Sequence, residues 1–102
     1  MSTRCCIGLY ESAADLKYYF FRPELIYYKH NDGYPRNMIN VISKWLKDTV
    51  IIGDIEETDG IHGDIDYYYA LAGDKILVYV PEYSHDNVVI KQAFKKIDEV
   101  VL

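Results

Sequence analysis

Apolar and polar residues alternate along this chain with two different periods, and the two periods predict two kinds of element. Residues 4–11, 16–21 and 25–29 are mostly apolar or aromatic, and each of the three segments is predicted to be a strand. From Pro35 to about Lys47, apolar residues recur every three or four positions, which predicts an amphipathic helix. The rest of the chain predicts strands at 49–55, 64–71 and 75–80, a tight turn at 72–74, and a final helix after Ser84.

This order of elements suggests that one unit occurs twice. Ile7-Gly8-Leu9-Tyr10-Glu11 is matched by Ile52-Gly53-Asp54-Ile55-Glu56, and Tyr18-Tyr19 is matched by Tyr68-Tyr69. The sequence therefore predicts repeat 1 over residues 1–48 and repeat 2 over residues 49–102, together forming a single domain over 1–102. A unit of about 50 residues rarely folds alone, so the two halves are expected to share one core.

The predicted fold class is α+β, with two tandem ββ(β)α repeats related by a pseudo-two-fold axis. Two helices are expected to cover one face of an antiparallel sheet, which leaves the opposite face exposed and rich in tyrosine. The shared core is predicted to contain Trp45, Leu46, Phe94 and Ile97.

Charge and composition exclude several classes of function. The 102 residues carry a formal net charge of −5, with a pI near 5.0. Nucleic-acid affinity depends mainly on lysine and arginine neutralising phosphates, so a nucleic-acid partner is not expected. No apolar run approaches the roughly 20 residues of a membrane span, and the first residues do not resemble a signal peptide. We therefore expect an intracellular protein without a membrane partner.

Tyrosine is unusually frequent in this chain, with 11 residues, several of them adjacent. Consecutive residues of a strand point to opposite faces, so each tyrosine run should place one ring toward solvent or a partner. Tyrosine is also enriched at protein interfaces. The predicted partner-binding residues are Tyr19, Tyr28, Tyr67, Tyr69 and Tyr79. A purely structural use of tyrosine in a half-buried sheet remains open.

The adjacent cysteines Cys5 and Cys6 predict little chemistry. On a strand one should face the core and the other should face outward, and no further cysteine completes a zinc site. A buried thiol beside an exposed one is the favoured interpretation. An intermolecular disulfide in a homodimer is the alternative.

Loop histidines and aspartates provide the alternative to a binding function. His30, Asp32, His62 and Asp64 are predicted in loops, and if they converged they could hold a divalent ion in a small metal-dependent nuclease or hydrolase. Their spacing matches no established metal motif. We therefore expect no catalytic residues, no metal and no cofactor.

The segment from Ile26 to Pro35 ends in Asp-Gly-Tyr-Pro and resembles a strand-then-DGYP signature of small uncharacterised phage proteins. The whole chain resembles small open-reading-frame proteins of filamentous viruses of hyperthermophilic archaea, of the Acidianus filamentous virus type. The resemblance implies a viral protein in the host cytoplasm and implies no activity.

Together these features predict a non-enzymatic viral interaction protein. It is expected to bind a peptide or protein partner, from the host or the virus, in a groove or at a sheet edge between the two repeats. Base stacking on exposed tyrosines is a third possibility, which the acidic net charge disfavours.

Overall fold

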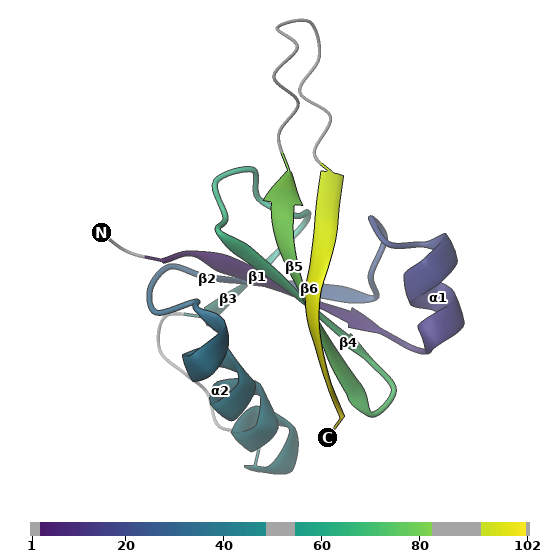
Figure 1. Cartoon of the computed structure of the whole chain (residues 1–102), viewed down its shortest axis with the longest axis horizontal. Helices are drawn as coiled ribbons and strands as arrows, with labels where there is room; N and C mark the ends of the chain where they lie inside the picture. Colours follow the sequence, from purple (N-terminus) through teal and green to yellow (C-terminus); the bar gives the residue numbers. More distant parts are fainter. Residues whose placement is uncertain (1–2, 49–54, 83–92, 102) are drawn as a thin grey trace, which may run out of the picture.

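A six-stranded sheet with one helix on each face makes up the described part of the chain, which comprises residues 3–48, 55–82 and 93–101 of a computed structural model (Figure 1). The elements follow in the order β1 (Cys5–Tyr10), α1 (Ala13–Tyr18), β2 (Leu25–Lys29), α2 (Pro35–Asp48), β3 (Ile55–Thr58), β4 (Tyr67–Ala72), β5 (Lys75–Glu82) and β6 (Ala93–Val101). The predicted α+β class is confirmed.

The strand order β3-β2-β1-β4-β5-β6 places two antiparallel blocks of three strands side by side. The blocks meet at β1 and β4, which run parallel, with Cys5 opposite Tyr67 and Tyr10 opposite Ala72. All other neighbouring strands are antiparallel. The sheet is therefore mixed, and not antiparallel throughout as the sequence predicts.

Both faces of the sheet are buried at its central strands. The α1-side core contains Cys6, Tyr10, Leu16, Ile26, Tyr28, Ile65, Tyr68, Ala70, Ala72 and Leu77. The α2-side core contains Cys5, Ile7, Met38, Ile42, Tyr69, Leu71, Ile76 and Val78. Successive residues of the central strands enter opposite cores, so Tyr68 and Tyr69 are both fully buried. The prediction of an exposed tyrosine face is wrong, because each helix covers a different face.

Helix α2 is the best-predicted element. It begins at Pro35 as the sequence indicates, and Met38 and Ile42 of its apolar stripe are fully buried. The side chains of Trp45 and Leu46 lie outside the described part, so their predicted place in the core is not tested.

The Asp-Gly-Tyr-Pro segment fastens α2 to the centre of the sheet. The Tyr69 hydroxyl donates to the Gly33 carbonyl at 2.6 Å, and the Gly33 N–H donates to the Thr3 carbonyl at 2.9 Å. A Cβ at Gly33 would lie 2.9 Å from the Cβ of Cys5, so glycine permits this close approach. Asp32 adopts a positive φ of 54° that fits a turn. This motif therefore has a structural role in the chain.

The structure does not show the predicted tandem repeat or its two-fold axis. The first half runs strand, helix, strand, helix, whereas the described part of the second half contains strands only. The predicted final helix is replaced over 93–101 by β6, which pairs with β5 from Ala93 opposite Glu82 to Val101 opposite Lys75. Phe94 packs on the α1-side core, but Ile97 is 48 % exposed and does not belong to a shared core.

Helix α1 replaces the start of the strand predicted at 16–21. The Ser12 hydroxyl accepts a hydrogen bond from the Asp15 N–H at 3.2 Å, which caps the first turn of the helix. Leu16 then points into the α1-side core. The Ser-x-x-Asp spacing before the helix is a capping signal that the tyrosine-rich run obscured.

Some of the other predicted elements are confirmed, and others are shortened or lie mostly outside the described residues. The strand predicted at 25–29 is β2, and the tight turn at 72–74 joins β4 to β5 with Gly73 at a φ of 63°. The strand predicted at 64–71 begins only at Tyr67. Most of the strand predicted at 49–55 lies outside the described residues, and β3 starts at its last position.

Edge strand β6 is irregular. Its pairing with β5 shifts register between Val78 and Tyr79, which leaves Ile97 as an extra residue in a bulge. Next to it, the Asp98 carboxylate accepts a hydrogen bond from the Glu99 N–H at 2.8 Å. Charged side chains at positions 95, 96, 98 and 99 surround the bulge.

Candidate partner-binding site

The five tyrosines predicted to bind a partner do not share one surface. Tyr28 and Tyr69 are buried, and Tyr67 is half-buried beside Tyr69 on the α2 side, with ring centroids 6.3 Å apart. Tyr19 is 57 % exposed, and Tyr79 is half-buried. Only Tyr19 and Tyr79 remain accessible next to α1, so that side of the molecule carries the candidate site.

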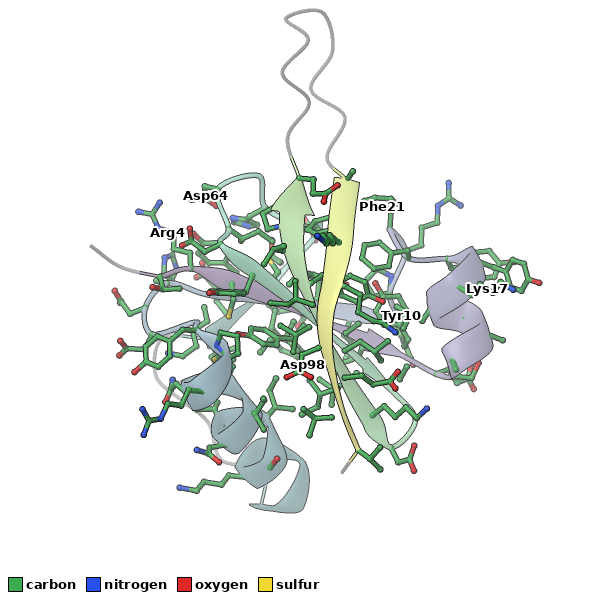
Figure 2. All side chains as sticks on the ribbon, viewed as in Figure 1. Arg4, Tyr10, Lys17, Phe21, Asp64 and Asp98 are labelled. Carbon is green, nitrogen blue, oxygen red and sulfur yellow. The ribbon has the colours of Figure 1, made fainter. Side chains whose placement is uncertain are left out.

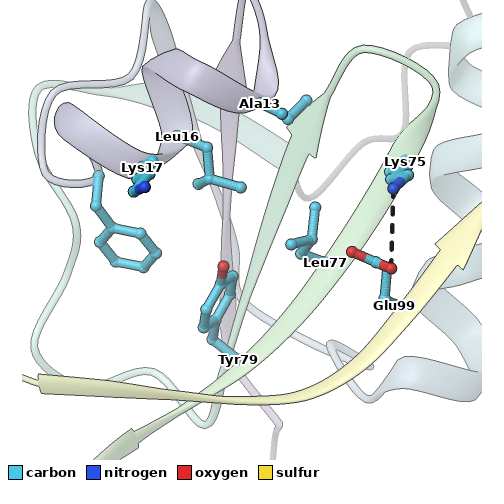
Figure 3. Close-up of a pocket in the computed structure, with 9 residues that line it drawn as sticks. Ala13, Leu16, Lys17, Lys75, Leu77, Tyr79 and Glu99 are labelled. Carbon is cyan, nitrogen blue, oxygen red and sulfur yellow. Dashed lines mark ion pairs between the residues drawn. The ribbon is translucent and has the colours of Figure 1, made fainter.

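A pocket of about 360 Å³ lies between α1 and the sheet (Figure 3). Helical spacing places Ala13, Leu16 and Lys17 along one wall, and Phe20, which follows the helix, also lines the pocket. Strands β4, β5 and β6 provide the remaining lining residues, which are Ala72, Lys75, Leu77, Tyr79 and Glu99. The pocket thus has an apolar floor and charged groups at its margins.

Phe20 gives this pocket a rigid aromatic wall. Its ring meets Tyr79 edge-to-face at a centroid distance of 5.0 Å and lies 5.3 Å from both Tyr68 and Phe94. Phe21 meets Phe20 edge-to-face at 5.1 Å. Aromatic pairs in these arrangements contribute about 1 kcal/mol each beyond the area they bury.

Buried hydroxyl groups hold the backbone of this segment. The Tyr10 hydroxyl donates to the Phe20 carbonyl, so the Tyr68 hydroxyl, 2.6 Å away, donates to Tyr10. Burial raises the pKa of Tyr10 to about 12 and raises the pKa of Tyr68 further, so both phenols stay neutral hydrogen-bonding groups. The segment after α1 is therefore fixed in place before any partner arrives.

Three large aromatic side chains beside this pocket are open to solvent. Tyr18 is 73 % exposed, Tyr19 57 % and Phe21 59 %. They line a second pocket of about 490 Å³ with Lys17, Phe20 and Arg22. The sequence prediction missed Tyr18 and Phe21, although four consecutive aromatic residues at 18–21 were a visible signal.

Charge is unevenly distributed around α1. In the first pocket Lys75 Nζ lies 3.9 Å from a Glu99 carboxylate oxygen, while Lys17 Nζ lies 5.6 Å from the centroid of the Tyr18 ring. A third pocket of about 200 Å³ has one lining residue from α1, Asp15, and is otherwise lined by residues just before and after the helix, which are Tyr10, Glu11, Tyr19, Arg22 and Glu24. Cations thus predominate on the apolar side of α1, and carboxylates predominate on the other.

Three of the four residues of the proposed metal site, His30, His62 and Asp64, converge around Tyr28. Figure 2 shows Asp64 beside Arg4, at the end of the sheet away from Lys17 of α1. The Tyr28 ring lies between His30 and His62, at centroid distances of 4.5 Å and 4.0 Å, and its hydroxyl donates to Asp64 at 3.0 Å. Asp32 instead lies next to α2, where its carbonyl accepts from Asn37.

The converging groups already have protein partners. His30 Nε2 lies 2.9 Å from Glu56, His62 Nε2 lies 2.9 Å from the Thr58 hydroxyl, and Asp64 lies 3.2 Å from Arg4. Over residues 3–48, 55–82 and 93–101, no group of three or more His, Cys, Asp or Glu is arranged to hold a metal ion. These polar groups therefore cover Tyr28 at the edge of the α1-side core, which is a structural role.

The two cysteines enter opposite cores, as adjacent strand residues should, but neither faces outward. Cys5 and Cys6 are both fully buried thiols, and burial raises the pKa of the Cys6 thiol to about 11. The prediction of one exposed thiol is wrong because both faces of β1 are covered. A disulfide between two copies would require β1 to leave the sheet.

Comparison with known proteins finds no matching family model, no matching curated protein and no matching solved structure. The resemblance to small viral proteins therefore stays a prediction. No helix among the described residues has the length and apolar character needed to cross a membrane.

Proposed function

We propose that this chain is a non-enzymatic interaction protein that binds a peptide or protein partner at the aromatic surface of α1. We define the aromatic surface as Tyr18, Tyr19 and Phe21 together with the first pocket, between α1 and strands β4, β5 and β6. The observation that carries the proposal is the exposure of three large aromatic side chains within four residues, directly beside a pocket.

Exposed aromatic side chains in a cluster differ from exposed apolar residues scattered singly. Single exposed residues are normal, whereas a contiguous patch marks interaction sites. Tyrosine and other aromatic residues also dominate the binding energy of protein interfaces, usually beside well-formed pockets. Phe20 and the Tyr10–Tyr68 hydrogen bond hold this surface rigid, which lowers the entropic cost of binding.

The proposed groove replaces the one expected between two repeats. It lies between α1 and the β4–β5–β6 block, and it keeps Tyr19 and Tyr79 of the predicted set while adding Tyr18 and Phe21. A viral setting, with a host or viral partner in the host cytoplasm, belongs to the same proposal and rests on sequence resemblance alone.

A peptide-display selection on the immobilised protein tests this proposal. We expect it to enrich peptides whose affinity falls at least tenfold in the double variant Tyr18→Ser/Phe21→Ser, because removing each aromatic side chain should cost more than about 1 kcal/mol of binding energy. Fluorescence polarisation of an enriched, labelled peptide measures the dissociation constant.

Tyr34→Ser is the matched control, because Tyr34 is 42 % exposed but lies before α2. It should leave binding unchanged. Equal affinity of the wild type and the double variant for every enriched peptide, or an equal loss in the Tyr34 variant, would refute the proposal.

A further inference from the structure

We infer that the aromatic surface selects acidic partners: its first pocket takes a large apolar side chain, and Lys17 contacts an adjacent carboxylate of the same peptide. This inference rests on the proposed function and adds the chemical class of the partner to it. Three observations support it: the apolar lining of the pocket, the pairing of Lys75 but not Lys17 with a carboxylate among the described residues, and the excess of cations here on a chain with a negative net charge.

The floor of the pocket suits an apolar side chain. Leu16, Phe20 and Leu77 supply apolar surface, and the small side chains of Ala13 and Ala72 leave the space between them open. A volume of about 360 Å³ lies in the range of pockets that bury small ligands or anchoring side chains. The aromatic contacts of Phe20 keep this space from collapsing.

The charged margin of the pocket favours an anion. Lys75 faces Glu99 at 3.9 Å, so this pair is internally compensated. Among the described residues, no carboxylate lies within ion-pair distance of Lys17, whose ammonium group contacts the Tyr18 ring. Figure 3 shows Lys17 on the α1 side of the pocket and the Lys75–Glu99 pair on the other. One uncompensated cation thus remains at the mouth.

The second pocket extends the same preference. It shares Lys17 and Phe20 with the first pocket and adds Arg22, and none of its lining residues in the described part of the chain is a carboxylate. Among the described residues, the two pockets together are lined by three cations and one carboxylate, on a chain whose formal net charge is −5. The carboxylates Glu11, Asp15 and Glu24 line the third, smaller pocket instead. An acidic peptide segment that binds along the first two pockets is therefore not repelled by the carboxylates of the third pocket.

A peptide fits this surface better than a nucleic acid does. Binding along a phosphate backbone requires a series of cations, because each neutralised phosphate contributes to affinity, and an acidic protein repels the rest of the strand. Lys17 and Arg22, which line the two pockets and are not the lysine paired with Glu99, suit one or two carboxylates beside an anchoring side chain.

The test uses the most strongly enriched peptide from the display selection and its counterpart with every Asp and Glu changed to the amide. At low salt we expect the acidic peptide to bind about three- to tenfold more tightly than the amide form, as one or two exposed ion pairs allow. Lys17→Glu should weaken the acidic peptide about tenfold. It should affect the amide form much less.

Lys44→Glu is the matched control, because Lys44 is an exposed lysine on α2 and should not affect either peptide. Enrichment of neutral or basic peptides that still depend on Tyr18 and Phe21 would overturn this inference and leave the proposed function standing. Failure to enrich any peptide would overturn both. Tighter binding of single-stranded oligothymidylate than of any peptide would overturn both in favour of nucleic acid.

Discussion

At the scale of single residues, close packing around buried tyrosines sets the strictest constraints. A Cβ at Gly8 would overlap the Tyr68 hydroxyl and lie 2.9 Å from the ring carbon that carries it. That hydroxyl is bound to Tyr10, which in turn holds the Phe20 carbonyl beside the proposed binding surface. The size of residue 8 therefore affects the position of the backbone just after α1, through the hydroxyl groups of Tyr68 and Tyr10. The sequence alone could not reveal this, because Gly8 pairs with Ala70 across two strands distant in the chain.

Gly8→Ala should accordingly destabilise the protein by about 2 kcal/mol, the usual cost of overpacking a core, as measured by chemical denaturation. Adding Tyr68→Phe should recover part of this stability, because the overlapping oxygen is removed. Gly60→Ala serves as the control, since a Cβ there meets no atom within 4 Å. A Gly8→Ala variant as stable as the control would contradict the close packing of residue 8 on Tyr68.

At the scale of elements, the sequence predicted those whose stabilising contacts are local. Helix α2 has one apolar stripe and a proline at its first position, and the β4–β5 turn has a glycine at its positive φ. Strand β6 was missed because Ala93, Phe94, Ile97 and Val101 also fit a helical stripe, while its pairing with β5 depends on tertiary structure. The candidate site was predicted in part, because Tyr19 and Tyr79 line its pockets. Tyr28 is instead covered by His30 and His62, and Tyr69 is buried in the α2-side core, through contacts that no local pattern indicates.

The charges of β6 should protect this sheet edge from pairing with a second copy. Edge strands carrying lysine and a bulge resist strand addition, and β6 has Lys95, Lys96 and the bulge at Ile97. We expect the double variant Lys95→Thr/Lys96→Thr to self-associate, because its edge strand is no longer charged there. Its mass-average molecular weight, measured by light scattering coupled to size-exclusion chromatography, should rise as the protein concentration is raised. Its stability should change by less than about 1 kcal/mol, because the ion pair that it removes, between Lys96 and Glu99 at 4.0 Å, is exposed to solvent.

For the edge variant, Lys44→Thr on α2 is the control and should behave like the wild type. If the double variant shows the same mass at every concentration, then charge at β6 does not govern self-association.

At the scale of the whole molecule, the sheet buries tyrosine hydroxyl groups on both of its faces, and the folded state favours the neutral form of these phenols. Burial raises the pKa values of Tyr10 and Tyr68 in the α1-side core and of Tyr69 in the α2-side core. A raised phenol pKa means that the folded state resists ionisation, whereas the unfolded chain ionises near pH 10. Stability from these groups is thus complete below about pH 10 and is lost as pH rises above it.

Alkaline titration tests this condition. The free energy of unfolding should begin to fall near pH 9, where the Cys6 thiol of the unfolded chain ionises. It should fall more steeply above about pH 10, with Tyr10 contributing about 2–3 kcal/mol by about pH 12. Denaturant unfolding at a series of pH values, together with phenolate absorbance, provides the measurement. Tyr10→Phe should reduce the slope above pH 10, and an unchanged slope would show that Tyr10 does not contribute.

The parallel junction of β1 and β4 has a consequence for synthesis of the protein on the ribosome. Strand β1 can pair with β2 soon after both have emerged, but its other edge pairs with β4, which is translated nearly 60 residues later. During that interval Cys5, Ile7 and the apolar stripe of α2 lack most of the β4 and β5 residues that later cover them. These apolar residues therefore stay exposed until β4 has emerged from the ribosome, which makes this interval of synthesis prone to aggregation.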